Sequence, residues 1–385
     1  MPNTFGHIFR VSSFGESHGP GIGVIIDGCP AGFQIDLEGI QTFLDRRRPG
    51  QSPWTSPRKE PDRVTCLSGL EGGRSLGSPL TLFVRNEDAR PSDYNTLNGL
   101  YRPSHADYTN HVKYGIRSQT GGGRSSARET IARVAAAGVA EQILSQIYPD
   151  LRTLAYVYSM KDIQAEEPLS FSDVSRKNID ELSPFRTIDS LVIPKMENLL
   201  QEAKTRGDSV GGVIRARIEN CPPGLGEPVF DKLHADLAKA MLSLPAARGF
   251  EIGSGFYSTQ LWGSEHNDPF VSLDGKIRTS TNHSGGVQGG ISNGETIWFS
   301  VAFKPVSTLA IKQLTVDESG VEQTLEVKGG RHDPCVLPRA VPLVEAMSSL
   351  VIMDHVLRQR TARRESGGNS SEEGQLVPPK IKLIP

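Results

Sequence analysis

Ser17 and His18 are the first neighbouring residues whose types could do chemistry together. They lie in Gly15-Glu16-Ser17-His18-Gly19, which has the G-x-S-x-G spacing of a serine-hydrolase nucleophile turn. That turn needs a helix directly after the serine, but here a Pro-Gly-Ile-Gly segment leads into a Val-Ile-Ile strand, and glycine and proline oppose a helix. The pattern predicts a loop that presents a hydroxyl and an imidazole. A serine nucleophile and an incidental surface pair are the alternatives.

A second candidate site is Gly121-Gly122-Gly123-Arg124-Ser125-Ser126, which opens a predicted helix. Glycines let the backbone approach a ligand closely, and a helix start carries unpaired N–H groups and a partial positive charge. Arg124 and Arg128 add forked donors suited to phosphate or carboxylate. The run matches neither a Walker loop nor a dinucleotide fingerprint. It predicts an anion cradle, and the alternative is a flexible loop before an ordinary capped helix.

Three further clusters gather arginine, histidine and aspartate. Arg46-Arg47-Arg48 ends a predicted helix, where one cation would stabilise the helix end and three repel one another unless an anion lies among them. The runs Arg102–Asp107 and Arg331–Cys335 each hold an Arg, a His and an Asp, and a turn with a surface hydrogen bond is the alternative for both. The histidines lack i, i+4 or C-x-x-C partners, so no metal site is predicted.

Composition restricts the partners. A formal net charge of -2 over 385 residues gives no global sign of nucleic-acid or membrane binding. The four cysteines are far apart in the sequence, which argues against a disulfide framework or a zinc knuckle. The N-terminus resembles no signal or transit peptide, and no apolar run approaches the length of a membrane span. A cytoplasmic protein without nucleic-acid or membrane partners is expected.

The elements that must position these residues are typical of an α+β protein. Strands are predicted over residues 23–27, 80–85, 151–160, 213–218 and 296–303, and helices over 37–48, 127–148, 232–244 and 343–358. Residues 24–32 and 216–224 both read as strand, Cys-Pro-x-Gly turn and helix, which predicts an internally duplicated strand-turn-helix unit. Residues 1–360 are expected to form a single catalytic domain with a polar connector over 161–190, and residues 361–385 a disordered tail.

Taken together, the motifs resemble those of the chorismate synthase family. The most diagnostic stretches of that family are matched by Phe14–Gly19, Gly121–Glu129 and Arg331–Cys335, and LDRRRPGQS, YRPSHADYT, FEIGSGF and GGISNGE are also similar. The likeness extends from about Thr4 to Arg358. It implies an anti-1,4-elimination of phosphate from 5-enolpyruvylshikimate-3-phosphate to give chorismate, with reduced FMN required. It also implies a layered β-α-β sandwich and a homotetramer.

The resemblance assigns catalytic roles to five residues. His18 is expected to protonate the departing phosphate and His105 to hold a proton near flavin N1 and O2, and these two assignments can be exchanged. Asp333 is expected to take the proton from flavin N5, relayed by Ser17 or Ser126. The substrate carries a charge of roughly −4, so the site needs many cations. The expected substrate ligands are Arg47, Arg48, Arg102 and Arg128. The expected FMN contacts are Arg124, Ser125, Ser126, Pro245, Ala246, Gly289, Lys304, Pro305, Val306, Ser307, Thr308 and Arg331.

Two departures from the family pattern bear on the cofactors. An NADP-associated arginine pair in the family falls on Arg47 and Pro53 here, so a site for NADPH is only half matched. The family's Lys-Pro-Thr-Ser-Ser reads Lys304-Pro305-Val306-Ser307-Thr308, which keeps two hydroxyls. Three classes of function follow: an FMN-dependent lyase, a serine hydrolase built on Ser17, and a non-catalytic phosphate- or nucleotide-binding protein that uses only the glycine loop.

Overall fold

The protein contains two antiparallel sheets of five strands each. The computed structural model describes residues 3–55, 60–87, 99–116, 122–327 and 333–362. The first sheet has the order β1-β2-β3-β7-β4 and the second the order β11-β16-β10-β8-β9. The first consists of β1 (Thr4–Phe5), β2 (Arg10–Gly15), β3 (Gly21–Asp27), β4 (Val64–Ser68) and β7 (Leu80–Arg85). The second consists of β8 (Arg152–Met160), β9 (Ile163–Gln164), β10 (Gly212–Glu219), β11 (Ala247–Ile252) and β16 (Ile297–Phe303). The five predicted strands are confirmed as β3, β7, β8, β10 and β16.

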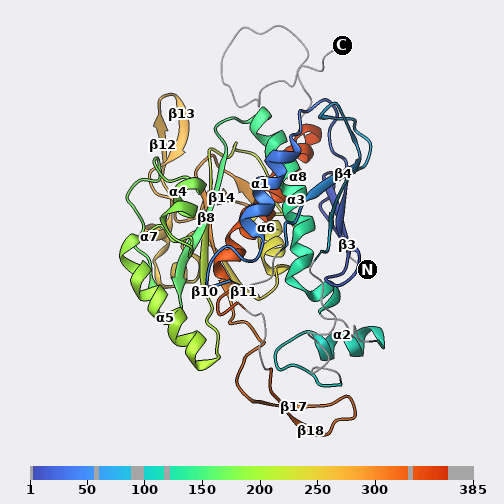
Figure 1. The fold of residues 1–385 in the computed structure, drawn as a ribbon. Helices are drawn as coiled ribbons and strands as arrows, with labels where there is room; N and C mark the ends of the chain where they lie inside the picture. Colours follow the sequence, from blue (N-terminus) through green and yellow to red (C-terminus); the bar gives the residue numbers. More distant parts are fainter. Residues whose placement is uncertain (1–2, 56–59, 88–98, 117–121, 328–332, 363–385) are drawn as a thin grey trace.

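Four helices pack against the sheets and one another: α1 (Leu37–Arg47), α3 (Thr130–Ile147), α6 (Leu233–Leu242) and α8 (Leu337–Ala362). Helix α3 contacts β2, β3 and β7, whereas α8 contacts β8 and β10, and the two helices also contact each other. Helix α1 packs on both of them, and α6 packs on α8 and β11. Figure 1 shows the four helices between β3 and β4 on one side and β8 and β10 on the other. The mixed helix and strand content predicted from the sequence is confirmed.

The two central helices are apolar on nearly every side, as expected for helices inside a core. Gly138 of α3 lets α1 approach closely, because a Cβ there would lie 3.2 Å from the Ile40 side chain. Within the described residues, Leu337–Arg360 is long and apolar enough to cross a membrane. The expectation that no run approaches this length is therefore wrong. The apolar window is wholly buried, which identifies α8 as a core helix.

The first residues of α1 and α3 show which capping signals in the sequence were interpreted correctly. Helix α1 begins as predicted, because the Asp36 carboxylate accepts the N–H groups of Glu38 at 3.1 Å and Gly39 at 2.9 Å. The helix predicted from residue 127 begins instead with a 3₁₀ turn over Ala127–Glu129, and the α-helix starts at Thr130. Ser126 caps that turn, but Glu129 does not complete a capping box. Its carboxylate accepts from Arg133 and from a β2 serine instead, since a charged donor makes the stronger bond.

The two Cys-Pro turns have the same local structure. In each turn the buried thiol of Cys29 or Cys221 lies 3.8 Å from the carbonyl oxygen of the following proline. A serine further along the chain donates to the same carbonyl at 2.7 Å, Ser75 in the first turn and Ser292 in the second. When the elements of the connections and hairpins are left out, the turns occupy corresponding places in β2-β3-α1-β4-β7-α3 and β8-β10-α6-β11-β16-α8.

The remaining elements lie in connections and projecting hairpins. The connector predicted over residues 161–190 contains β9 and α4, and α5 follows it without having been predicted. The predicted tail overlaps the end of α8 by two residues, and from residue 363 it lies outside the described part of the chain. These elements are α2 (Asp107–Tyr114), α4 (Arg176–Leu182), α5 (Ile193–Arg206), α7 (Gly263–His266), β5 (Leu70–Glu71), β6 (Arg74–Ser75), β12 (Phe270–Leu273), β13 (Lys276–Thr279), β14 (Val287–Gln288), β15 (Ile291–Ser292), β17 (Gln313–Val316) and β18 (Glu322–Leu325).

Candidate active site

A cavity of about 950 Å³ lies where the start of α3, the end of α6 and three loops meet the first sheet. Its volume is at the upper end of the range for small-molecule sites, roughly 300–1,000 Å³. It combines apolar side chains with charged groups and hydroxyls, the usual mixture for a site that binds and orients a polar ligand. The apolar part is lined by Phe5, Val11, Val24, Ala132, Pro245, Val336, Met347 and Leu350.

Positive charge dominates the cavity. Five cationic and two carboxylate side chains line it: Arg124, Arg133, Lys239, Arg248 and Lys304, with Glu129 and Asp333. Arg133 is paired with Glu129 at 2.9 Å. Burial, together with the nearby charge of Arg248, lowers the pKa of Lys304 from its ordinary value. The lining therefore favours an anionic ligand over a neutral one.

The loop of residues 304–308 is fastened to the loop that carries His105. Ser104 has a φ of 57°, an uncommon conformation for a residue other than glycine. Its carbonyl oxygen accepts from Lys304 Nζ at 3.1 Å and from Ser307 Oγ at 2.9 Å. Lys304 Nζ also donates to Ser307 Oγ at 2.6 Å. The two predicted ligand-binding segments, distant in the sequence, thus form one wall of the cavity.

His105 is oriented by a buried ion pair within its own segment. Its Nδ1 lies 2.8 Å from Asp107 Oδ1, and Arg102 donates to the two oxygens of that carboxylate at 2.7 Å each. Although burial opposes it, hydrogen bonds from Arg102 and His105 hold the pKa of Asp107 well below its usual range. The carboxylate accepts the Nδ1 proton, which leaves Nε2 as the nitrogen able to exchange a proton.

Arg124 connects the glycine-rich turn to β2. Its guanidinium donates to the carbonyl oxygens of Ser13 at 3.1 Å and Gly15 at 3.0 Å, and to Ser13 Oγ at 2.6 Å. Ser125, next in the chain, accepts from Asn110 of α2 at 2.8 Å. Arg124, which lines the cavity, therefore also contacts Gly15, the last residue of β2.

Ser17 and His18 lie in the turn after β2, residues 16–19, here called the Ser-His turn. Ser17 Oγ and His18 Nδ1 are 2.9 Å apart, and Ser17 is buried whereas His18 is partly exposed. The turn joins β2 to β3, so no helix follows the serine. The structural context of a hydrolase nucleophile is absent here.

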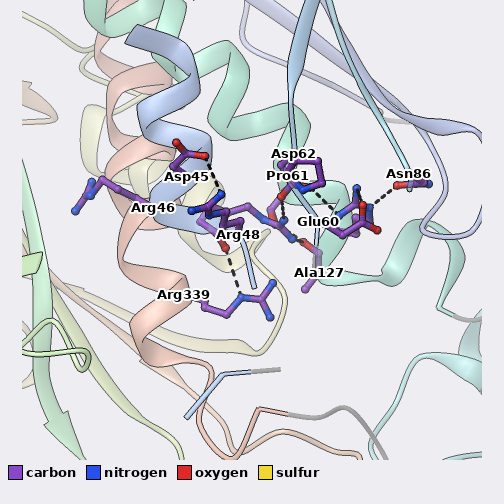
Figure 2. Close-up of polar contacts among 12 residues, drawn as sticks. Asp45, Arg46, Arg48, Glu60, Pro61, Asp62, Asn86, Ala127 and Arg339 are labelled. Atoms are coloured by element: carbon purple, nitrogen blue, oxygen red, sulfur yellow. Dashed lines mark hydrogen bonds and ion pairs between the residues drawn. The ribbon is translucent and has the colours of Figure 1, made fainter. Parts of the chain in front are cut away.

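Two predicted substrate ligands, Arg47 and Arg128, are buried around one carboxylate. Arg47 Nη1 lies 3.0 Å from Asp62 Oδ2, and Arg128 Nη1 lies 2.9 Å from Asp62 Oδ1. Glu60 Oε2 is a further 3.4 Å partner of Arg128. Burial lowers the pKa of Arg47 to about 9, against the attraction of Asp62, and at neutral pH it remains a cation. Figure 2 shows Glu60 and Asp62 of this group, with Asn86 at its far end.

The other two arginines of the RRR run have different surroundings. Arg48 lies 3.7 Å from Asp45 and its side chain is 45% exposed, so it is accessible to a ligand. Arg46 pairs with Asp180 at 2.6 Å and with Glu345 in the interior. Carboxylates of the protein itself therefore offset the repulsion expected for Arg46 and Arg47.

Known proteins are similar to this chain over most of its length. The family model for chorismate synthase matches residues 9–357. The chorismate synthase of Opitutus terrae is 55% identical over 359 residues, which cover 93% of this chain and 98% of that protein. That of Methylacidiphilum infernorum is 53% identical over 367 residues, covering 94% and 97%. The chain belongs to the chorismate synthase family. A crystal structure of a chorismate synthase also superposes with a TM-score of 0.73 at 29% identity, over 92% of this chain and 93% of that one.

Membership of the chorismate synthase family decides among the three classes of function. The chain is an enzyme, a lyase of class EC 4.2.3.5, with the chorismate synthase function of the shikimate pathway and of aromatic biosynthesis. It acts on a small molecule, and the family has a general requirement for a flavin. The serine-hydrolase and binding-protein alternatives are set aside.

The cavity is lined by many of the site residues that the resemblance to chorismate synthases predicted. Those in the lining are His105, Arg124, Ser125, Pro245, Ala246, Lys304, Pro305, Val306, Ser307, Thr308 and Asp333. Those outside it are Ser17, His18, Arg47, Arg48, Arg102, Ser126, Arg128 and Gly289. Arg331 lies outside the described residues. Gly289 is in the β14–β15 turn beside the first residue of α6, whereas the cavity meets that helix only from Lys239 onward.

Asp333 lines the cavity and forms an ion pair that the sequence did not predict. Arg339, in the first turn of α8, donates to Asp333 Oδ2 at 2.6 Å and to the Arg47 carbonyl oxygen at 3.4 Å. The sequence also missed the cavity residues Arg133, Lys239, Ser243 and Arg248. One sequence signal pointed to Arg133. It follows Glu129 by four residues on a helix, a spacing at which the two side chains can form an ion pair. Among the described residues, no cluster of ligands suited to a metal is present.

Proposed function

We propose that the cavity binds reduced FMN and 5-enolpyruvylshikimate-3-phosphate, and that the chain converts the latter to chorismate and phosphate by anti-1,4-elimination. The observation that carries this proposal is the cavity of about 950 Å³, in which five cationic side chains face an apolar wall. Both ligands are flat or cyclic polyanions, and each phosphate adds a charge of about −1.5 to −2 at neutral pH.

The side chains present fit a flavin mononucleotide. Arg124, Lys304 and the hydroxyls of Ser125, Ser307 and Thr308 supply donors for its phosphate and ring oxygens. Pro245, Met347 and Leu350 supply apolar surface for its tricyclic ring. When bound, reduced FMN would lend electron density to the substrate ring and take up the hydrogen from its C6.

We propose that His105 holds a proton at Nε2 for the flavin edge. The 2.8 Å contact between its Nδ1 and Asp107 supports this, because a fixed tautomer leaves Nε2 free to donate. We propose that His18 donates a proton to the departing phosphate.

Asp333 is proposed as the final acceptor of the proton that would be held at flavin N5, with Ser17 or Ser126 as relays. Asp333 lines the cavity, and Arg339 Nη1 lies 2.6 Å from its Oδ2. Ser17 Oγ is within 2.9 Å of the His18 ring, so the hydroxyl can pass a proton to or from it. Exchange of the two histidine roles is the alternative assignment.

The four proposed substrate arginines divide by exposure. Arg48 is half exposed and would bind the substrate directly. Arg47, Arg102 and Arg128 are 2%, 8% and 4% exposed and already paired with Asp62 or Asp107, so we propose that they hold the site in shape. Because Arg47 is buried and each of its three guanidinium nitrogens donates to a protein acceptor, we propose that the flavin is reduced by an external donor and not by NADPH bound at Arg47.

A duplicated, layered β-α-β fold is proposed for the subunit. It is supported by the two corresponding runs of elements and by the matching Cys29 and Cys221 turns. Gly50 and Ala246, each following a proline after α1 and α6, have φ values of 77° and 67°. Equal backbone conformations at equal places are expected of two related halves.

A homotetramer is proposed for the assembly, and a cytoplasmic location is supported by the family's biosynthetic role. Projecting segments expose large apolar side chains, which commonly mark subunit contacts. The exposed residues around β12 and β13 are Phe256, Tyr257, Trp262, Phe270, Val271, Leu273 and Ile277, and those around α2 and β17–β18 are Tyr108, Val112, Tyr114, Ile116, Leu314, Val316 and Val321. The mass in solution would test the number of subunits.

The deciding experiment is anaerobic incubation with dithionite-reduced FMN and 5-enolpyruvylshikimate-3-phosphate, following chorismate absorbance and phosphate release. Product should form with reduced FMN and not with oxidised FMN alone. The His18→Ala variant should bind FMN with unchanged affinity but form chorismate only at a small residual rate. Absence of product from the folded wild-type protein would refute the proposed reaction, and full turnover by the variant would refute the role of His18.

A further inference from the structure

Asn86 joins the buried arginine cluster to the Ser-His turn. Its side-chain Nδ2 donates to the carbonyl oxygen of Glu16 at 3.0 Å and to that of Gly19 at 2.7 Å. Its backbone N–H donates to the Pro20 carbonyl oxygen at 3.1 Å. One residue just beyond the end of β7 therefore holds both ends of a turn that belongs to a different hairpin.

Asn86 is itself held from the interior. Arg128 Nε donates to its Oδ1, while Arg128 Nη1 donates to Asp62 at 2.9 Å and Nη2 to the Arg85 carbonyl oxygen at 3.3 Å. Only the amide oxygen can accept from a guanidinium, so Arg128 fixes which way the Asn86 amide points. The side chains of Arg128 and Asp62 are 4% and 0% exposed, which makes this anchor rigid. Figure 2 shows Asn86 reached by this cluster.

We propose that Asn86 is a positioning residue for His18, through which the Asp62–Arg128 pair sets the orientation of the Ser-His turn. The proposal rests on the proposed function, in which His18 donates a proton to the leaving group. It also gives Arg128 a part in the reaction without contact with the substrate. A catalytic group displaced by about 1 Å can lose about 10²-fold in rate, so a turn held by two amide bonds is sensitive to their loss.

The Asn86→Asp variant tests this with little change of shape. It keeps an oxygen for Arg128 but replaces the Nδ2 donor with an acceptor, which repels the carbonyl oxygens of Glu16 and Gly19. Asn220→Asp is the matched control, because it removes an Nδ2 bond to the Asp150 carbonyl oxygen, 2.8 Å long, away from the cavity lining. We expect kcat to fall by about 10²-fold in Asn86→Asp and to change less than about 2-fold in the control. FMN affinity should be unchanged in both.

Two further readouts separate positioning from a general structural role. Hydrogen exchange of the amides in residues 16–19 should accelerate in Asn86→Asp and not in Asn220→Asp. In a double-mutant cycle with His18→Ala, the substitution at Asn86 should change the residual rate by less than about 2-fold, because a residue that acts through His18 has nothing left to position.

Unchanged exchange in the turn, or rate losses that multiply in the double variant, would overturn the role of Asn86. A loosened turn with normal kcat would also overturn it. The single His18→Ala variant distinguishes this from failure of the proposed function, since full turnover in that variant removes His18 from the reaction whatever Asn86 does.

Discussion

Asp62 is the carboxylate on which two buried guanidinium groups depend, and its removal gives the sharpest test of the arginine cluster. Its side chain is 0% exposed, and those of Arg47 and Arg128 are 3% and 4% exposed. Asp62→Asn keeps the shape, and its φ of 47° suits asparagine at least as well as aspartate. The new amide oxygen replaces only one carboxylate oxygen, and the amide carries no charge. Arg128 keeps Glu60 as an ion-pair partner, whereas Arg47 loses the counter-charge of Asp62 in the interior, which costs about 3–5 kcal/mol.

We therefore expect Asp62→Asn to lower the free energy of unfolding by about 3–5 kcal/mol, a large share of the roughly 5–15 kcal/mol of a typical protein. Urea unfolding followed by circular dichroism at pH 7 measures it, and the m-value checks that the transition is the same. Asp27→Asn is the control, since its pair with Arg10 has side chains 49% and 52% exposed and should be worth less than about 1 kcal/mol. Equal small losses in both variants would refute the reasoning that the cluster is desolvated and interdependent.

Three further predictions follow from the same structure. Asp107→Asn removes the acceptor that fixes the His105 tautomer, so kcat should fall by about 10²-fold or more with FMN affinity unchanged, and an anaerobic assay with full activity would contradict it. Hydrogen bonds outweigh burial and lower the pKa of Asp268 to about 2, so its stabilisation is complete above the unfolded pKa of about 4 and is lost as the pH falls toward 2. The difference in unfolding free energy between wild type and Asp268→Asn should shrink over that pH range, and a constant difference in urea titrations would count against it. Burial raises the pKa of the thiols of Cys29, Cys221 and Cys335 to about 11 or 12, so these thiols should resist alkylation of the native protein at pH 8. Mass spectrometry should find Cys66 as the one modified cysteine at most, and early labelling of the other three would show that the core opens.

Short-range signals in the sequence determined much of the fold. Alternation and apolar runs predicted five strands that the structure contains, and Asp36 begins α1 as its residue type predicts. The ion pair that orients His105 could also have been predicted from the sequence, because Arg102, His105 and Asp107 lie in one short segment. Such features depend on neighbours within a turn or two of the chain, and these are visible in a sequence.

Tertiary structure alone decided what most of the arginines do. Arg47 and Arg128 are 81 residues apart in the chain, and both reach Asp62, which no local pattern connects with either of them. Lys239 and Arg248 join the cavity only because α6 packs on α8 and β11. A guanidinium beside a ligand and one beside a buried carboxylate have the same sequence signature. Only the packing of distant elements determines which counter-charge each arginine meets and whether water reaches it.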